Sequence, residues 1–163
     1  MTIPNYVHIL VIMNNHSMEP LSGTVNYAAE CTCLNLRKAT RYITGLYDEC
    51  LRPVGLRATQ LPVLMALAQA GSVTISRLSE ILLMDRTTLT RDLKPLERQK
   101  LVSITTGEDR RRRYISLTPA GEDLLASALP LWEQAQSRVR SCIGEDREKA
   151  LLVQLSELVK LVR

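Results

Sequence analysis

The stretch from Met84 to Thr118 constrains the fold most, because its apolar residues change period part-way along. Asp85 can cap a helix, since its carboxylate accepts from free N–H groups of the first turn and complements the helix dipole. Leu89, Leu93 and Leu96 then recur at helical spacing and form one apolar face. This pattern predicts a helix packed against others. The opposite face is polar and basic, with Thr87, Arg91, Lys94 and Arg98.

Two short runs after this helix, residues 101–105 and 114–117, alternate with period two and are rich in branched and aromatic residues. Such runs are typical of strands, and their separation predicts a hairpin. The turn between them carries four consecutive arginines, Arg110 to Arg113. Four adjacent guanidinium groups repel one another unless an anion is near, and a phosphate backbone or an electronegative minor groove neutralises them. The arginine run therefore predicts that the hairpin binds nucleic acid.

Two motifs in this region resemble those of the multiple-antibiotic-resistance regulator (MarR) family of winged helix-turn-helix proteins. That family shows Asp-x-Arg in its wing followed by Leu-Thr-x-x-Gly, and this chain has Asp109-Arg110-Arg111 and Leu117-Thr118-Pro119-Ala120-Gly121. The resemblance covers residues 24–163. It implies a mainly α fold with a small β-hairpin wing, in which a winged helix-turn-helix is joined to a helical dimerisation region.

The expected organisation has four parts: an N-terminal extension (1–23), a dimerisation helix (24–54), a winged helix-turn-helix (55–118) and C-terminal dimerisation helices (119–163). The extension is interpreted either as an arm that packs on a partner subunit or as a tail. Residues 24–51 are expected to form one long helix, with Thr59 capping the second and Asp146 the last. A final amphipathic helix with no partner in its own chain predicts a homodimer.

The predicted DNA-binding residues lie on the reading helix and the wing. Arginine can bind guanine with two donors, and threonine can offer a hydroxyl to phosphate or a methyl to thymine. The resemblance implies that Asp109 orients a wing arginine for the minor groove, with Arg111 at the family's Asp-x-Arg position. Strand alternation prevents all four wing arginines from pointing into one groove, so others are expected over phosphates. The candidates are Arg86, Thr87, Thr88, Thr90, Arg91, Lys94, Asp109, Arg110, Arg111, Arg112 and Arg113.

The charge distribution supports this location of the interface. The whole chain of 163 residues carries a formal charge of +4. Nine basic against five acidic residues between 84 and 118 give the same +4, so the net charge resides in the predicted reader and wing. The absence of phenylalanine and the abundance of Leu, Ala and Val indicate helices packed on helices.

The four cysteines do not suggest a disulfide framework in a chain of this length, so a cytoplasmic location is expected. Neither a signal peptide nor a membrane span is expected, because the apolar run near the N-terminus is short and lacks a basic start. Cys31, Cys33 and Cys50 are candidate redox sensors, since some members of the resembling family sense oxidants through cysteine; buried core cysteine is the alternative. On a continuous helix Cys31 and Cys33 would lie on nearly opposite faces.

A candidate effector cleft involves Tyr42, Leu46 and Tyr47, at a place where the family often binds small anionic aromatic molecules; the alternative is the edge of the core. No metal and no cofactor are expected. The sequence thus predicts a homodimeric regulator that binds a pseudo-palindromic operator in double-stranded DNA, a repressor released by an effector. The alternatives are a redox- or metal-responsive regulator of the same fold and an interaction module that no longer binds DNA. An enzyme is not expected, because no phosphate loop, metal-ligand cluster or Ser/His/Asp set is evident.

Overall fold

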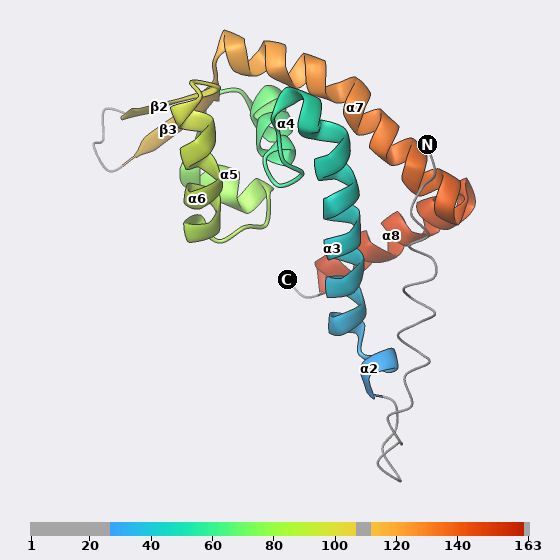
Figure 1. Cartoon of the computed structure of the whole chain (residues 1–163). Coiled ribbons are helices and arrows are strands. Elements are labelled where there is room, and N and C mark those ends of the chain that lie inside the picture. Colours follow the sequence, from blue (N-terminus) through green and yellow to red (C-terminus); the bar gives the residue numbers. More distant parts are fainter. Residues whose placement is uncertain (1–26, 107–111, 162–163) are drawn as a thin grey trace. The chain divides into compact units, whose positions relative to one another are not determined.

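The computed structural model describes residues 27–106 and 112–161, and the chain divides into two compact units, residues 1–39 and 40–163. Its elements, labelled in Figure 1, are mainly helical. In chain order they are α2 (Tyr27–Glu30), α3 (Thr32–Leu51), the 3-10 turn η1 (Arg52–Val54), α4 (Leu61–Ala70), β1 (Val73–Thr74), α5 (Ile75–Ile81), α6 (Arg86–Arg98), β2 (Val102–Thr106), β3 (Arg113–Leu117), α7 (Pro119–Ile143) and α8 (Glu145–Leu161).

The prediction of one long helix over residues 24–51 is wrong at Cys31, which separates α2 from α3. The side-chain amide of Asn35 donates to the carbonyls of Ala29 (2.9 Å) and Cys31 (3.0 Å). The N–H of Leu34 is directed at Cys31 Sγ, at 3.5 Å. The Asn35 N–H still donates to the Cys31 carbonyl at 3.0 Å, so the side-chain bonds add to the backbone bonding at this break, and the helix restarts at residue 32. Residues 24–26 lie outside the described part of the chain.

Two predicted caps are also wrong. Helix α4 begins at Leu61, and Gln60 rather than Thr59 occupies its N-cap position, without a side-chain capping bond. The Gln60 side chain instead accepts from the Arg57 N–H at 3.0 Å. Helix α8 begins at Glu145, and the carbonyl of Gly144 accepts its first helical bond, so Asp146 lies within the first turn.

The sheet is three-stranded and antiparallel, in the order β1-β3-β2. The pairing of β2 with β3 runs from Val102 opposite Leu117 to Thr106 opposite Arg113, which confirms the hairpin. The short strand β1 adds to the other edge of β3. Ile115, in the middle of β3, is fully buried, so the sheet covers one side of the helical core.

The larger hydrophobic core packs the reading helix α6 against α4, α5 and the sheet. Leu64 of α4, Leu78 of α5 and the three α6 leucines are buried with Ile115. At roughly 2 kcal/mol for each fully buried leucine, this packing orients α6 far more strongly than helix propensity does. Leu125 and Ala128 of α7 belong to the same core. A smaller cluster further along α7 consists of Leu46, Cys50 and Ala135.

Candidate DNA-binding surface

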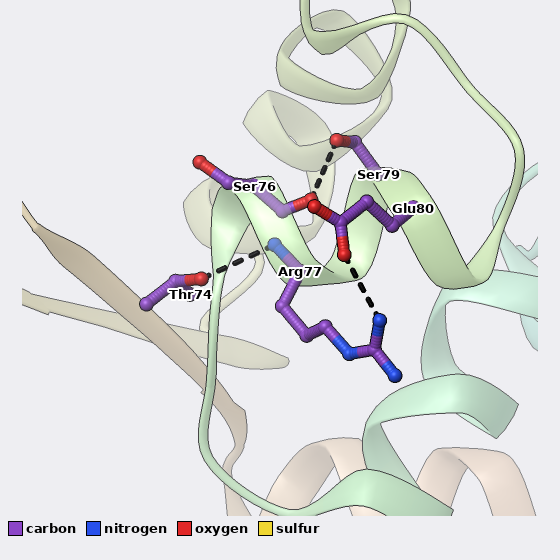
Figure 2. A network of polar contacts seen from close by, with 5 residues as sticks. All are labelled: Thr74, Ser76, Arg77, Ser79 and Glu80. Carbon is purple, nitrogen blue, oxygen red and sulfur yellow. Dashed lines mark hydrogen bonds and ion pairs between the residues drawn. The ribbon is translucent and has the colours of Figure 1, made fainter.

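Helix α5 begins with a side-chain cap. Thr74 Oγ1 accepts from the Arg77 N–H at 3.1 Å. Figure 2 shows Arg77 extending along the helix to Glu80, at 2.9 Å, while the Ser79 hydroxyl donates to the carbonyl of Ser76 at 2.7 Å. The ion pair is solvent-exposed and therefore contributes little to stability. These contacts join only residues of α5 and its N-cap, so they are local to the first helix of the helix-turn-helix.

The turn into α6 contains a feature that the sequence did not indicate. Leu83 has a left-handed backbone, with φ of 54°. The N–H groups of Met84 and Leu83 donate back to the carbonyls of Ser79 (3.0 Å) and Glu80 (3.3 Å), the pattern of a Schellman motif. Glycine usually occupies such a position, so a leucine there gives no sequence signal.

Asp85 caps α6 as predicted, and its Oδ1 accepts from the Thr88 N–H at 2.9 Å. Hydrogen bonds from the side chain and the backbone of Thr88 lower the pKa of this carboxyl, because they favour its ionised form. The cap directs the free N–H groups and the positive end of the helix dipole outward at the start of α6. Such a helix N-terminus favours a phosphate.

The two faces of α6 are divided as the periodicity predicted. Leu89, Leu93 and Leu96 have 0%, 2% and 0% of their surface exposed. The predicted contact residues of α6 are exposed except Thr88, which is partly buried; the exposed ones are Arg86, Thr87, Thr90, Arg91 and Lys94. The hydroxyl of Thr90 donates to the carbonyl of Arg86 at 2.7 Å, which leaves its methyl group and oxygen lone pairs for a ligand.

The wing extends from the same core as α6, since β2 packs beside that helix (Figure 1). Arg112 and Arg113, at the start of the returning strand, are exposed. The predicted contacts Asp109, Arg110 and Arg111 lie outside the described residues. The register pairs Thr106 with Arg113 at the end of the hairpin, so Arg113 lies at the end of the paired strands, and Arg112 directly precedes it.

Comparison with known proteins identifies the fold that carries this surface. The sequence model of the MarR family matches residues 54–113. SarZ of Staphylococcus epidermidis, a helix-turn-helix transcriptional regulator, is 34% identical over 100 residues, which cover 61% of this chain and 68% of SarZ. MosR of M. tuberculosis, solved in complex with DNA, is 34% identical, covers 82% of this chain with 98% of its own length, and has a TM-score of 0.71. The chain belongs to the MarR family.

A further structure of this type, the transcriptional repressor CouR bound to a 23-mer DNA duplex, has a TM-score of 0.75 at 25% identity. It covers 83% of this chain with 97% of its own length. The mainly helical fold with a small antiparallel sheet is that of the family, which confirms the predicted winged helix-turn-helix. As a family member, the chain is a DNA-binding transcriptional regulator.

The cysteines of this MarR-family protein occupy different environments. Cys31, between α2 and α3, and Cys33, in the first turn of α3, are exposed, as is Cys142 near the end of α7. Cys50 is buried, and Arg138 Nη1 is directed at its sulfur from 3.5 Å while also pairing with Glu49 at 3.4 Å. Cys50 therefore lies in the small α3–α7 cluster, and no contact within the described residues joins it to another thiol. The sensor role of Cys31, Cys33 and Cys50 stays a prediction.

The residues of the predicted effector cleft are separated by their packing. Tyr42 is 54% exposed, whereas Leu46 is buried against Ala135. The Tyr47 hydroxyl donates to Gln136 Oε1 of α7 at 2.6 Å. Burial raises the pKa of Tyr47, and the charge of Glu148 on α8 raises it further. The cleft itself stays a prediction.

Two kinds of site are absent from residues 27–106 and 112–161. These residues contain no group of three or more His, Cys, Asp or Glu side chains arranged to hold a metal ion. No helix within them has the length and apolar character needed to cross a membrane.

Proposed function

We propose that two copies of this chain bind a pseudo-palindromic operator as a repressor, with one α6 helix in each of two successive major grooves. The supporting observation is the capped, exposed basic face of α6, held by a leucine core and flanked by an arginine wing. Half-sites about one helical turn, roughly 34–36 Å, apart fit a two-fold dimer of this kind. MosR and CouR, both solved in complex with DNA, provide a precedent for DNA binding by this fold.

The residues of α6 then have distinct roles. Arg86, Thr87 and Arg91 read base edges, because they are exposed in the N-terminal half of the helix. Lys94, one turn further on, neutralises phosphate. Thr90 offers its methyl group, since its hydroxyl hydrogen is used within the helix. Thr88 contributes through its bond to Asp85, which orients the start of the helix.

In the wing, Arg110, Arg111, Arg112 and Arg113 supply cationic groups to the minor groove and the flanking phosphates. Asp109 orients Arg111. Arg113 is the first residue of β3, so we expect it to lie over the DNA backbone. Loss of a wing arginine therefore weakens both specific and random DNA binding.

A fluorescence-anisotropy titration with DNA from upstream of the protein's own gene tests the reader. Arg91→Ala should weaken operator binding by about 5- to 150-fold, the discrimination of one bidentate arginine, with a smaller effect on random DNA. Arg111→Ala should weaken binding to both and reduce the salt slope by about 1. Arg147→Ala, which removes the same charge from α8, is the control. Equal binding by Arg91→Ala and the control would refute the assignment of α6.

The proposed dimer rests on the apolar surface of α8. Leu151, Leu152, Leu158 and Val159 are between 39% and 57% exposed, and together they follow one face of the helix. An apolar face of this kind is expected to be covered by a partner, and a second copy of the chain supplies the same face by two-fold symmetry.

Analytical ultracentrifugation tests the dimer. Leu158→Glu should produce monomers and abolish tight binding to the palindrome, because a charge is placed within the apolar contact. Val153→Glu, five residues earlier and about 140° around the helix from Leu158, places the same charge outside this face and should remain dimeric. If Leu158→Glu sediments as the wild-type dimer does, α8 is not the interface.

Release of the DNA requires an effector that binds best to a dimer in which the two α6 helices have a different spacing. A small aromatic or anionic molecule bound near Tyr42, Leu46 and Tyr47 is one source of this preference. Oxidation of the exposed Cys31 and Cys33 is the other, supported by the accessibility of both thiols. If the Cys31→Ser, Cys33→Ser protein releases DNA on peroxide treatment as the wild type does, these thiols are not the sensor.

A further inference from the structure

The C-terminal end of α6 is followed by a residue with an unusual backbone conformation. Lys100 has a left-handed backbone, with φ of 58°. Its N–H donates to the carbonyl of Glu97 at 2.9 Å, and the N–H of Leu101 donates to the carbonyl of Leu96 at 2.9 Å. This is again a Schellman motif, and only three residues separate the end of α6 from the start of β2. The carbonyls of Lys100 and Leu101 are thereby held in defined directions just beyond the reading helix.

Both of these carbonyls are bonded by Thr118, the residue that caps α7. The Thr118 hydroxyl donates to the carbonyl of Lys100 at 2.7 Å, and the Thr118 N–H donates to the carbonyl of Leu101 at 3.1 Å. The same hydroxyl oxygen accepts from the Gly121 N–H in the first turn of α7, at 3.1 Å. A single threonine therefore connects the end of α6 to the start of α7.

Gly121 brings the two backbones into direct contact. A Cβ atom built on Gly121 would lie 2.0 Å from the carbonyl oxygen of Leu101 and 3.2 Å from Cδ2 of Leu117. The contact is buried and lies between backbone atoms, so no flexible side chain can yield. The first turn of α7 can approach β2 this closely only because residue 121 lacks a side chain.

We propose that Lys100, Leu101, Thr118 and Gly121 form a rigid joint, here named the α6–α7 joint, through which α7 sets the position of the reading helix. Thr118 and Gly121 are its positioning residues. The proposal rests on the proposed function, in which α6 enters the major groove and α7 leads to the dimer helix α8. Because interfaces this closely packed do not deform continuously, a tilt of α7 moves α6 with it. A signal that changes the dimer helices therefore reaches the DNA through this joint.

The rigidity of the joint can be tested without DNA by native-state hydrogen exchange of the wild-type protein. The N–H groups of Thr118 and Gly121 should be protected to within about tenfold of the Leu93 N–H in the core of α6. Exchange of the two joint amides as fast as that of Lys160, near the end of α8, would overturn the proposal. No variant is required, so a failure to fold cannot obscure the result.

Distances between spin labels test the coupling itself. Labels on Arg98→Cys and the native Cys142 span the joint, in a background with Cys31→Ser and Cys33→Ser and with an excess of unlabelled protein. Cys142 is roughly 36 Å along α7 from Thr118, so a small hinge motion moves its label by several ångströms. Thr118→Val should broaden or shift the distance distribution, while Thr118→Ser and the control Ser127→Ala, which removes a hydroxyl elsewhere on α7, should not. An unchanged distribution in Thr118→Val would overturn the proposal.

Operator affinity then separates this proposal from the proposed function. Thr118→Val should bind the wild-type operator at least tenfold more weakly and lose its preference for one half-site spacing over a spacing changed by one base pair. Restored spacing preference in Thr118→Ser supports the joint, and a retained preference in Thr118→Val overturns it. A wild-type protein that binds no DNA would refute the proposed function alone, since exchange and distances still decide the joint.

Discussion

Replacement of Gly121 by alanine should destabilise the protein, whereas the same change at Gly45 should stabilise it. Both glycines lie within helices, where alanine is intrinsically favoured by about 1 kcal/mol. Gly45, in α3, has no atom within 4 Å of the position that a Cβ would occupy, so Gly45→Ala gains this propensity. Gly121 is also helical, in the first turn of α7, but a Cβ there would meet the Leu101 carbonyl, so the two glycines compare an open with an occupied position.

The expected cost at Gly121 follows from its contact with the Leu101 carbonyl. Ordinary contact begins at 3.4 Å and the Cβ would lie at 2.0 Å, so the backbones must separate by about 1.4 Å. Such a shift would break the Thr118 N–H bond to the Leu101 carbonyl, now 3.1 Å long, and the Thr118 hydroxyl bond to the Lys100 carbonyl, now 2.7 Å long. Two hydrogen bonds at about 1 kcal/mol each and about 2 kcal/mol of overpacking, offset by the helix propensity, leave a net loss of about 3 kcal/mol.

Urea unfolding followed by circular dichroism, with thermal melting as a second measurement, tests this pair. Gly121→Ala should lower the melting temperature by roughly 6–12 °C, and Gly45→Ala should raise it by roughly 2–4 °C. If both variants shift stability in the same direction, or if Gly121→Ala is neutral, the close approach of α7 to β2 is not a constraint on the fold.

Three further outcomes are expected. Leu93→Ala should lower the free energy of unfolding by about 2–5 kcal/mol in urea titrations, because Leu93 is 2% exposed in the reader core; a loss below about 1 kcal/mol would contradict that packing. The Thr88 hydrogen bonds lower the pKa of Asp85, so the ionised carboxylate stabilises the folded protein above the ordinary pKa of aspartate, and this stabilisation is lost as the pH falls through the lowered pKa. Asp85→Asn keeps a cap but does not titrate, so its urea unfolding midpoint should fall less steeply with decreasing pH than that of the wild type. Burial raises the pKa of Tyr47, which favours the neutral phenol in the folded state, so stability should fall as pH rises through the range where free tyrosine ionises. Tyr47→Phe should flatten that alkaline decline, and a decline as steep as in the wild type would assign it to other groups.

Several local elements were predictable because their causes are close in sequence. The cap by Asp85 and the leucine face of α6 each depend on residues within a turn or two of one another. The hairpin followed from alternation on both sides of a charged turn. Local patterns of this kind determine helix and strand type well because hydrogen bonding and burial act along the chain.

The positions that the sequence did not predict correctly depend on contacts that leave no trace in the spacing of apolar residues. Cys31 interrupts the first helix because the Asn35 amide bonds to two carbonyls there. Leu83 and Lys100 adopt left-handed backbones without being glycine, since the surrounding helices and strands over-determine their conformation.

The sequence alone was sufficient to predict the reading helix with its basic face, the hairpin and the arginine run, because charge and apolar period are properties of residue order; the winged helix-turn-helix was implied by the resemblance of its motifs to the MarR family. Only the tertiary structure revealed what Leu-Thr-x-x-Gly does after the wing: Thr118 bonds the two carbonyls beyond α6, and Gly121 allows a backbone contact with Leu101. That contact joins residues twenty positions apart, so its steric demand emerges only when β2 and α7 are packed together.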